Sequence, residues 1–416
     1  QGKEYLLSSA EDKSAIENAL GISLPEVGAT EAILDFTSLL PQLMTDKGAT
    51  VTSTIEVDVK ANNRWASEDA TVNRVYTLKC NKPEFSIVTN PGNFWCKEFS
   101  VDSCDIKTGD IETISQKIQY QYRKKGDEQW IDCDRLVQFD DYPVDKQYQI
   151  RAVYREGIET EPVDVVLETP QQLPNSDMEE WYIEEKKKSG TWPFKDKTYY
   201  TFHPYAEGNA SSSWWATNND KAQGGTYALG IWYEGCFASC VSYTEDAHGG
   251  TKAALMYLSG CGDGYANTAG TYVGGAMVGS LFIGTYDSGI IQGHDFDSRP
   301  TSMSFWYKYK PYNSDAFKVV VSLKNGDREI ATGTYEPAAS SEEDGEYGHA
   351  TVDFNYTEPF EKATSICVQF LASNKTSLSQ SDFDLGTTIT YPVIGDWTVH
   401  MGSILEIDDI SLAFDK

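Results

Sequence analysis

The sequence predicts a mainly β protein. Short segments in which apolar and polar residues alternate recur along the chain, and Gly, Asn and Pro turn signals separate them. A helical pattern is confined to one short segment near the start. The 416 residues are enough for two or three domains, and a hydrophobic fraction of 40% is too high for a disordered chain.

The charge balance limits the partners that the chain can bind. The sequence has 34 Lys and Arg against 63 Asp and Glu, a net charge of −29, which argues against binding nucleic-acid phosphates or an anionic membrane surface. No apolar run is long enough for a transmembrane helix. Aromatic residues make up 12% of the chain, including 10 Trp and 25 Tyr, more than core packing usually requires.

Residues 1–80 predict a short helix followed by a small β element. Ser9 is a good N-cap with an acidic residue three positions later, apolar residues then recur at helical spacing, and Gly21 stops the pattern. Residues 54–60 alternate between apolar and polar as in a half-buried strand, and residues 72–78 are a candidate partner strand.

Residues 81–170 predict a second β domain. Strand patterns occupy residues 117–123 and 148–154, and a Gly126 turn follows the first of them. The pattern resembles a fibronectin type III or related immunoglobulin-like sandwich, with Tyr148 near the place of that fold's corner tyrosine. This resemblance implies a spacer or a protein-binding module rather than an enzyme.

Residues 171–416 predict a large two-sheet jelly roll. Long helical patterns are absent, and Asn325-Gly326 is a strong hairpin signal between two of the strand candidates. The main strand candidates are residues 227–233, 253–258, 280–286, 302–309, 317–323, 329–335, 350–356 and 365–371.

Four sequence blocks of this third region carry a family resemblance. They are residues 173–181 (LPNSDMEEW), 215–218 (WATN), 299–309 (RPTSMSFWYKY) and 407–410 (IDDI). In this order they resemble the "putative carbohydrate metabolism domain" family, a jelly roll found chiefly in exported, often lipid-anchored proteins of gut Bacteroidetes. Residues 33–41 resemble the accessory domains that precede it. The family is similar in plan to the calcium-containing carbohydrate-binding modules attached to glycoside hydrolases.

That resemblance implies a structural calcium ion between the first and last strands of the jelly roll. The matching residues are Glu179 with Asp409 or Asp408, and carboxylates on neighbouring strands are ligands that calcium prefers. The alternative is that Asp408 and Asp409 cap the end of a strand while Glu179 is solvated.

Five tryptophans are candidates for binding a sugar ring, which needs flat apolar faces beside hydrogen-bonding groups. Strand parity places Trp232 and Trp306 opposite the apolar faces of their segments, so we expect both on a polar, exposed face. Trp192, Trp214 and Trp215 occur in Gly-, Ser- and Asn-rich stretches that we expect to form loops at the rim. The alternative for each is an ordinary core or loop anchor.

Catalysis has less support, because the chain lacks HExxH, GxSxG and Walker motifs, and some of its 63 acids will pair by chance. We therefore predict a non-catalytic protein that binds a polysaccharide or oligosaccharide, and that also has other surface proteins as candidate partners. A glycoside hydrolase and a structural or adhesive surface protein are the alternatives. The start at Gln1-Gly2-Lys3 is typical of a mature chain, and with the resemblance it predicts export to the cell surface or periplasm, with a lipid anchor.

Overall fold

A computed structural model describes residues 6, 8–29, 31, 33–35, 51–61, 70–80, 83–109, 111–155, 158–190, 192, 196–223, 227–228, 231–232, 237–260, 276–337, 345–383 and 388–416. The chain divides into two compact units. The first comprises residues 1–89, 100–137 and 147–165, and the second comprises residues 90–99, 138–146 and 166–416.

The first unit begins with the predicted helix and strands. Helix α1 (Ala10–Leu20) starts after Ser9, whose side chain accepts a hydrogen bond from the Asp12 backbone N–H, and ends at Gly21 in the left-handed conformation (φ 62°). Strands β1 (Val51–Ala61) and β2 (Ala70–Cys80) pair antiparallel over their full lengths. The helix, the first strand and its partner are therefore confirmed.

The remainder of the first unit consists of short strands paired in small sheets. One sheet has the order β10-β9-β6-β7 with β11 also paired to β9, and a separate pair joins β3 to β5. Helix α3 was not predicted. The short strands β4 and β8 each include residues assigned to both units. The bounds are β3 Phe85–Val88, β4 Glu98–Ser100, β5 Ser103–Ile106, α3 Ile111–Lys117, β6 Gln119–Lys124, β7 Ile131–Cys133, β8 Leu136–Gln138, β9 Gln147–Arg155, β10 Ile158–Glu159 and β11 Val163–Val166.

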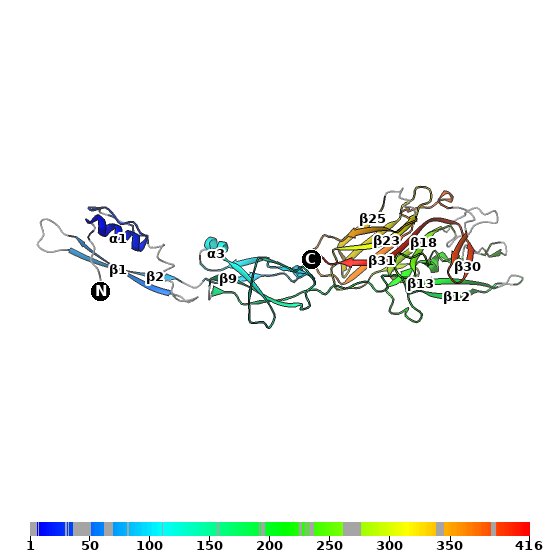
Figure 1. Ribbon diagram of the computed structural model, residues 1–416, viewed down its shortest axis with the longest axis horizontal. Coiled ribbons are helices and arrows are strands. Elements are labelled where there is room, and N and C mark those ends of the chain that lie inside the picture. The colour runs from blue at the N-terminus through cyan, green and yellow to red at the C-terminus, as the bar shows by residue number, and fades with distance from the viewer. Residues whose placement is uncertain are drawn as a thin grey trace. The chain divides into compact units, whose positions relative to one another are not determined.

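The second unit contains the predicted two-sheet sandwich (Figure 1). The larger sheet has the order β14-β20-β28-β24-β25-β27, with β21 and β22 attached, and comprises β14 Trp215–Thr217, β20 Ser280–Tyr286, β21 Ile290–Gln292, β22 His294–Asp295, β24 Lys318–Asn325, β25 Arg328–Tyr335, β27 Asn355–Tyr356 and β28 Ser365–Leu371. The smaller has the order β17-β18-β31-β23-β26, with β19 attached, and comprises β17 Val241–Thr244, β18 Ala253–Ser259, β19 Met277–Val278, β23 Ser302–Lys310, β26 Gly348–Asp353 and β31 Met401–Ala413.

Hairpins and short helices make up further described parts of this unit. The hairpins are β12 (Tyr182–Lys188) with β13 (Lys197–His203), β15 (Tyr227–Ala228) with β16 (Ile231–Trp232), and β29 (Thr388–Tyr391) with β30 (Gly395–Thr398). The helices are α4 (Asn219–Ala222) and the 3-10 turns Pro91–Asn93 and Gln380–Asp382.

The core of the sandwich follows from strand alternation. Val319, Val321 and Leu323 of β24 are fully buried and face the smaller sheet, as do alternate residues of β28, whereas alternate residues of β31 face the larger sheet from the opposite side. Phe305 of β23 contacts Phe370 of β28 edge to face, with ring centroids 5.3 Å apart. The two apolar faces therefore enclose one continuous core.

One predicted strand is wrong. Residues 227–233 were expected to run as a single strand, but Tyr227 pairs with Trp232 and Ala228 pairs with Ile231 in an antiparallel hairpin. The chain therefore reverses between these segments, and the alternation within residues 227–233 does not define two faces of one strand. The domain limits at residues 80 and 170 remain a prediction. Among the described residues, no helix is long and apolar enough to cross a membrane.

A buried ion pair stabilises the second unit. Arg299, 1% exposed, donates from Nε to the Glu168 carboxylate at 2.9 Å and from Nη1 to the Pro359 carbonyl at 2.7 Å. Its guanidinium lies over the Trp95 ring, 3.7 Å from the centroid. Arg299 thereby connects residues 90–99 and residue 168 to the loop that follows β27.

Candidate functional site

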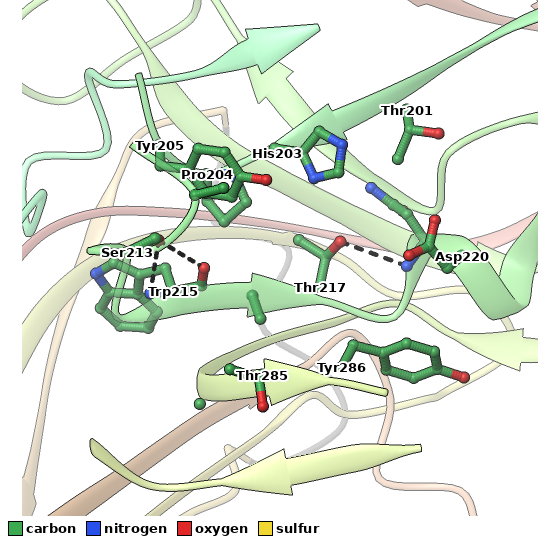
Figure 2. Close-up of a pocket in the computed structure, with 14 residues that line it drawn as sticks. Thr201, His203, Pro204, Tyr205, Ser213, Trp215, Thr217, Asp220, Thr285 and Tyr286 are labelled. Atoms are coloured by element: carbon green, nitrogen blue, oxygen red, sulfur yellow. Dashed lines mark hydrogen bonds between the residues drawn. The ribbon is translucent and has the colours of Figure 1, made fainter. Parts of the chain in front are cut away.

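A pocket of about 210 Å³ opens in the second unit between the end of β13 and the end of β20 (Figure 2). Its walls combine aromatic rings with hydroxyl, imidazole and carboxylate groups. The lining residues are Thr201, His203, Pro204, Tyr205, Ala210, Ser213, Trp215, Ala216, Thr217, Asn219, Asp220, Gly284, Thr285 and Tyr286.

The alternation of β13 supplies one wall. Phe202 is fully buried in the core, where it stacks on Tyr391 at 5.3 Å, so its neighbours Thr201 and His203 point to the opposite side. The His203 ring stacks on Tyr205 at 5.2 Å and on Tyr182 of β12 at 5.9 Å. His203 and Tyr205 therefore present one continuous aromatic wall.

The opposite wall comes from the end of β20, where Figure 2 shows Thr285 and Tyr286. Gly284 precedes them with φ 140°, and a Cβ at this position would overlap the Ile291 carbonyl of β21. Only glycine permits this close approach. Gly284 thereby allows the close pairing of β20 with β21 directly before Thr285 and Tyr286, which line the pocket.

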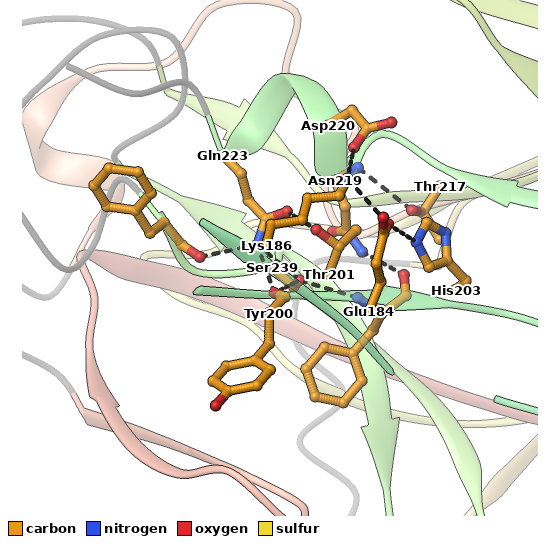
Figure 3. Close-up of polar contacts among 12 residues, drawn as sticks. Glu184, Lys186, Tyr200, Thr201, His203, Thr217, Asn219, Asp220, Gln223 and Ser239 are labelled. Atoms are coloured by element: carbon orange, nitrogen blue, oxygen red, sulfur yellow. Dashed lines mark hydrogen bonds and ion pairs between the residues drawn. The ribbon is translucent and has the colours of Figure 1, made fainter. Parts of the chain in front are cut away.

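Two buried amides, Asn219 of the pocket lining and Gln223 at the end of the same short helix α4, hold this part of the chain in place (Figure 3). Asn219 donates from Nδ2 to the carbonyls of Phe202 and Val241, at 2.9 and 2.8 Å, and its Oδ1 accepts from the Val241 N–H at 2.9 Å. Gln223 donates to the Tyr200 and Phe237 carbonyls at 2.6 and 2.9 Å. These side chains join β13 to β17 and fix α4 beneath the pocket.

A chain of charged groups borders the pocket. Lys186 of β12 lies with Nζ 2.8 Å from Asp220 Oδ1 and 3.3 Å from Glu184 Oε2, and the same Glu184 oxygen lies 2.9 Å from His203 Nε2 (Figure 3). Burial acts to raise the pKa of Glu184, but the hydrogen bond with His203 and the charge of Lys186 outweigh it and hold the pKa below its usual value.

Of the five predicted tryptophans, three were expected in loops at the rim of the jelly roll, and the structure places them differently. Trp192 is 91% exposed, beyond the end of β12. Trp214 is half-buried and stacks on His294 with ring centroids 4.1 Å apart. Trp215 was expected in a loop but begins β14 and is 2% exposed, because its indole packs in the core and donates to the Pro174 carbonyl at 2.8 Å.

Trp306 lies on the outer face of the smaller sheet, as parity predicts. Its neighbours Phe305 and Tyr307 face the core, whereas the Trp306 indole stacks on His248 at 3.8 Å and contacts His349 at 4.9 Å. One face of the indole is therefore covered by an imidazole. The side chain of Trp232 lies outside the described residues.

The three carboxylates predicted to bind calcium converge on one loop, residues 245–252. Glu179 accepts hydrogen bonds from the backbone N–H groups of Thr251 and Lys252, at 2.5 and 2.9 Å. Asp408, which is fully buried, accepts from the His248 and Gly249 N–H groups at 2.8 and 3.0 Å. The positions of these acids in the sequence do not by themselves indicate that they lie close together. That expectation came from the family resemblance.

The fit of a metal ion to this loop depends on oxygen donors. A Cβ at Gly249 would lie 2.5 Å from Asp409 Oδ2, and a Cβ at Gly250 would overlap Glu179 Oε1, so paired glycines leave room for the two carboxylates. Among the described residues, no three His, Cys, Asp or Glu side chains are close enough together to hold a metal ion. Backbone carbonyls would have to complete a calcium shell, which calcium accepts.

Sequence comparisons leave the family of this chain open. No protein-family model matches the sequence, and no curated protein matches it.

Solved structures give distant likenesses. The complex of TmCBM61 with β-1,4-galactotriose matches at 12% identity over 48% of this chain and 88% of that chain, with a TM-score of 0.23. A structure described for the promiscuous specificity of carbohydrate-binding modules from the β-sandwich superfamily matches at 8% identity. The match covers 79% of this chain and 97% of that chain, with a TM-score of 0.25. The K2 cleaved adhesin domain of Lys-gingipain matches at 15% identity over 49% of this chain and 89% of that chain, with a TM-score of 0.23. TM-scores this low establish neither a family nor a function.

Sequence reasoning placed Tyr205 near the rim but missed His203, Asp220 and Tyr286. The available signal was the alternation of Thr201, His203 and Tyr205 about the apolar Phe202, which indicates a strand with a polar, aromatic side. The charged run of residues 184–188 hid the partner strand β12, because it lacks apolar alternation.

Proposed function

We propose that this protein is a non-catalytic carbohydrate-binding protein, and that the pocket between β13 and β20 is its sugar site. The observation that carries the proposal is the pairing of the His203–Tyr205 aromatic wall with the polar side chains of Asp220 and Thr285 in one pocket. Sugar rings present apolar C–H faces together with hydroxyl groups, so they bind where aromatic faces and hydrogen-bonding groups meet.

The hydrogen-bonding groups of the pocket support this use. Thr201 is committed to Gln223, and Ser213 is committed to Trp215. The Thr285 hydroxyl, the Tyr205 phenol and Asp220 Oδ2 have no hydrogen-bond partner among the described residues. These three groups remain for the hydroxyls of a ligand.

Affinity gel electrophoresis against a panel of polysaccharides, followed by calorimetry with the retained glycan, tests the proposal. Tyr205→Ala and Tyr286→Ala should each abolish most of the retardation, whereas Phe360→Ala, which removes an exposed aromatic outside the pocket, should leave it unchanged. Retardation that is equal in all four proteins, or absent from the wild type, overturns the pocket assignment.

The same preparations separate the alternatives. Release of reducing sugar from the retained polysaccharide would identify a glycoside hydrolase, and binding to surface proteins without any glycan retention would identify an adhesive or structural protein. Trp192, Trp214, Trp232 and Trp306 remain proposed sugar contacts separate from the pocket, whereas the burial of Trp215 in the core argues against that role for it. Of these, Trp192 has the most exposed side chain among those described.

Export belongs to this proposal, with the protein placed at the cell surface or in the periplasm and held by a lipid anchor. The support is the resemblance of the four sequence blocks to a family of exported Bacteroidetes proteins. Fractionation of the source cells, with and without protease treatment of intact cells, tests it.

A structural calcium ion at Glu179, Asp408 and Asp409 is the second part of the proposal. Glu179 with either Asp409 or Asp408 would hold the ion together with loop carbonyls, and the ion would offset the repulsion between the two carboxylates. The paired glycines at 249 and 250 support it, because they leave room for two of the three carboxylates against the loop.

A further inference from the structure

The size of the pocket limits how much ligand it can hold. Its volume of about 210 Å³ is below the roughly 300 Å³ at which pockets begin to enclose drug-sized ligands. One pyranose ring is smaller than such a ligand, whereas an oligosaccharide is larger. Sugar units beyond the first must therefore lie outside the pocket.

The charge of the lining limits which sugar unit can enter. Among the described lining residues there is no lysine or arginine, and the one carboxylate is that of Asp220, whose side chain is 52% exposed. Lys186, which borders the pocket, forms ion pairs with both Asp220 and Glu184, so its charge is already balanced by two carboxylates. The whole chain carries a net charge of −29.

The free oxygen of Asp220 has a direct chemical preference. Oδ1 accepts the hydrogen bond from Lys186, and Oδ2 has no hydrogen-bond partner among the described residues. A carboxylate oxygen accepts hydrogen bonds from sugar hydroxyls but repels a second carboxylate or a sulfate. Recognition through Asp220 therefore depends on the absence of negative charge on the ligand.

We infer that the pocket takes a single sugar unit without negative charge, and that Asp220 excludes uronates and sulfated sugars. The inference rests on the proposed carbohydrate binding and names the class of sugar recognised there. It predicts that affinity depends little on chain length and that a neutral sugar binds better than the uronate of the same configuration.

The test is isothermal titration calorimetry at pH 8 and low salt, with the constituent monosaccharide of the retained polysaccharide, its uronate, and its di- and tetrasaccharide. For a glucan these are glucose, glucuronate and the two oligosaccharides; for a galactan they are galactose, galacturonate and the corresponding oligosaccharides. We expect the neutral sugar to bind about fivefold more tightly than the uronate, as like charges about 4 Å apart in water would require. Added salt should reduce this ratio.

Asp220→Asn should move the ratio of the two affinities towards one while the fold is retained. The control is Glu185→Gln, which removes an exposed carboxylate of the neighbouring strand β12. Glu185 pairs with Lys187 outside the pocket, so its loss should leave the ratio unchanged. The wild-type ratio tests the inference independently of either variant.

The outcomes separate the two proposals. If the uronate binds as tightly as the neutral sugar, if only anionic polysaccharides are retained, or if affinity rises more than about tenfold from monosaccharide to tetrasaccharide, the inference is wrong while carbohydrate binding stands. If no polysaccharide and no sugar binds, the proposed function itself fails.

Discussion

The indole of Trp306 lies nearly parallel to the imidazole of His248, with ring centroids 3.8 Å apart and an angle of 12° between the planes. His248 Nδ1 lies 2.6 Å from Asp409 Oδ2, and the His248 backbone N–H donates to Asp408. Trp306, His248 and the acids Asp408 and Asp409 of β31 thus form one connected set of contacts. The loop of residues 245–252 is stabilised through it.

Trp306→Ala should therefore destabilise the second unit. The variant removes the ring against which His248 packs, and we expect the free energy of unfolding to fall by about 1–3 kcal/mol, less than for a fully buried tryptophan. Urea denaturation measures this, and Trp192→Ala, which removes an exposed indole, is the control. Equal stability of the two variants would contradict a structural role for the stacking.

Asn219→Ala should cost more than an exposed asparagine. It leaves the Phe202 and Val241 carbonyls and the Val241 N–H buried without their partner, which costs at least about 2 kcal/mol. Asn209→Ala, in the exposed loop after β13, is the matched control. Thermal unfolding compares them, and calorimetry with the retained glycan should show that the Asn219 variant also loses affinity. Unchanged stability and affinity would mean that α4 does not support the pocket.

Glu184 should make stability depend on acid pH. Its folded pKa lies below the 4.5 of a free glutamate, so its contribution is present above pH 4.5 and is lost as the pH falls through the lowered value. Glu184→Gln should be less stable than the wild type at pH 7, and the difference should shrink as the pH falls below 4.5 and through the lowered pKa of Glu184. The effect is small because the side chain is partly exposed.

The measurement for Glu184 is the melting temperature as a function of pH. Glu185→Gln, the adjacent residue whose carboxylate pairs with Lys187 at 3.3 Å, serves as the control and should run parallel to the wild type. A Glu184→Gln curve that also runs parallel to the wild type, at any offset, would rule out the predicted linkage.

Arg299→Ala should be the most destabilising single change among these predictions. Removing the guanidinium leaves the buried Glu168 carboxylate without its main cation, for which we expect about 3–5 kcal/mol. Arg328→Ala, which breaks an exposed pair with Glu361 at 2.6 Å, should cost less than about 1 kcal/mol. Chemical denaturation of both variants decides it. Comparable losses would show that burial does not govern the Arg299 contribution.

Calcium should raise the melting temperature relative to EGTA. A bound ion at a free concentration a hundredfold above Kd adds about 2.7 kcal/mol to the free energy of unfolding. Glu179→Gln should remove the difference, whereas Glu180→Gln, its exposed neighbour, should retain it. Identical melting curves of the wild type in calcium and in EGTA would leave the calcium proposal without support.

Much of the fold could be predicted from local pattern. Alternation identified the strands that became β18, β20, β23, β24, β25 and β28, and Asn325-Gly326 identified the β24–β25 turn, where Gly326 has φ 58°. Parity also placed Trp306 opposite Phe305. These features depend on neighbouring residues and on which side of a strand is apolar, so a single sequence contains them.

The candidate site depended on contacts that sequence patterns do not contain. His203, Asp220 and Tyr286 come from a strand, a helix and another strand. Asn219 joins β13 to β17 beside them, and Gly284 allows β20 to pair closely with β21. Trp215 looked like a loop residue because Ser and Asn surround it, yet sheet pairing with Ile283 and the Pro174 carbonyl bury it. The amino-acid sequence alone determined the strands and their apolar faces. Which polar faces meet in the pocket depends on the tertiary structure, because the packing of the whole core sets how distant strands pair.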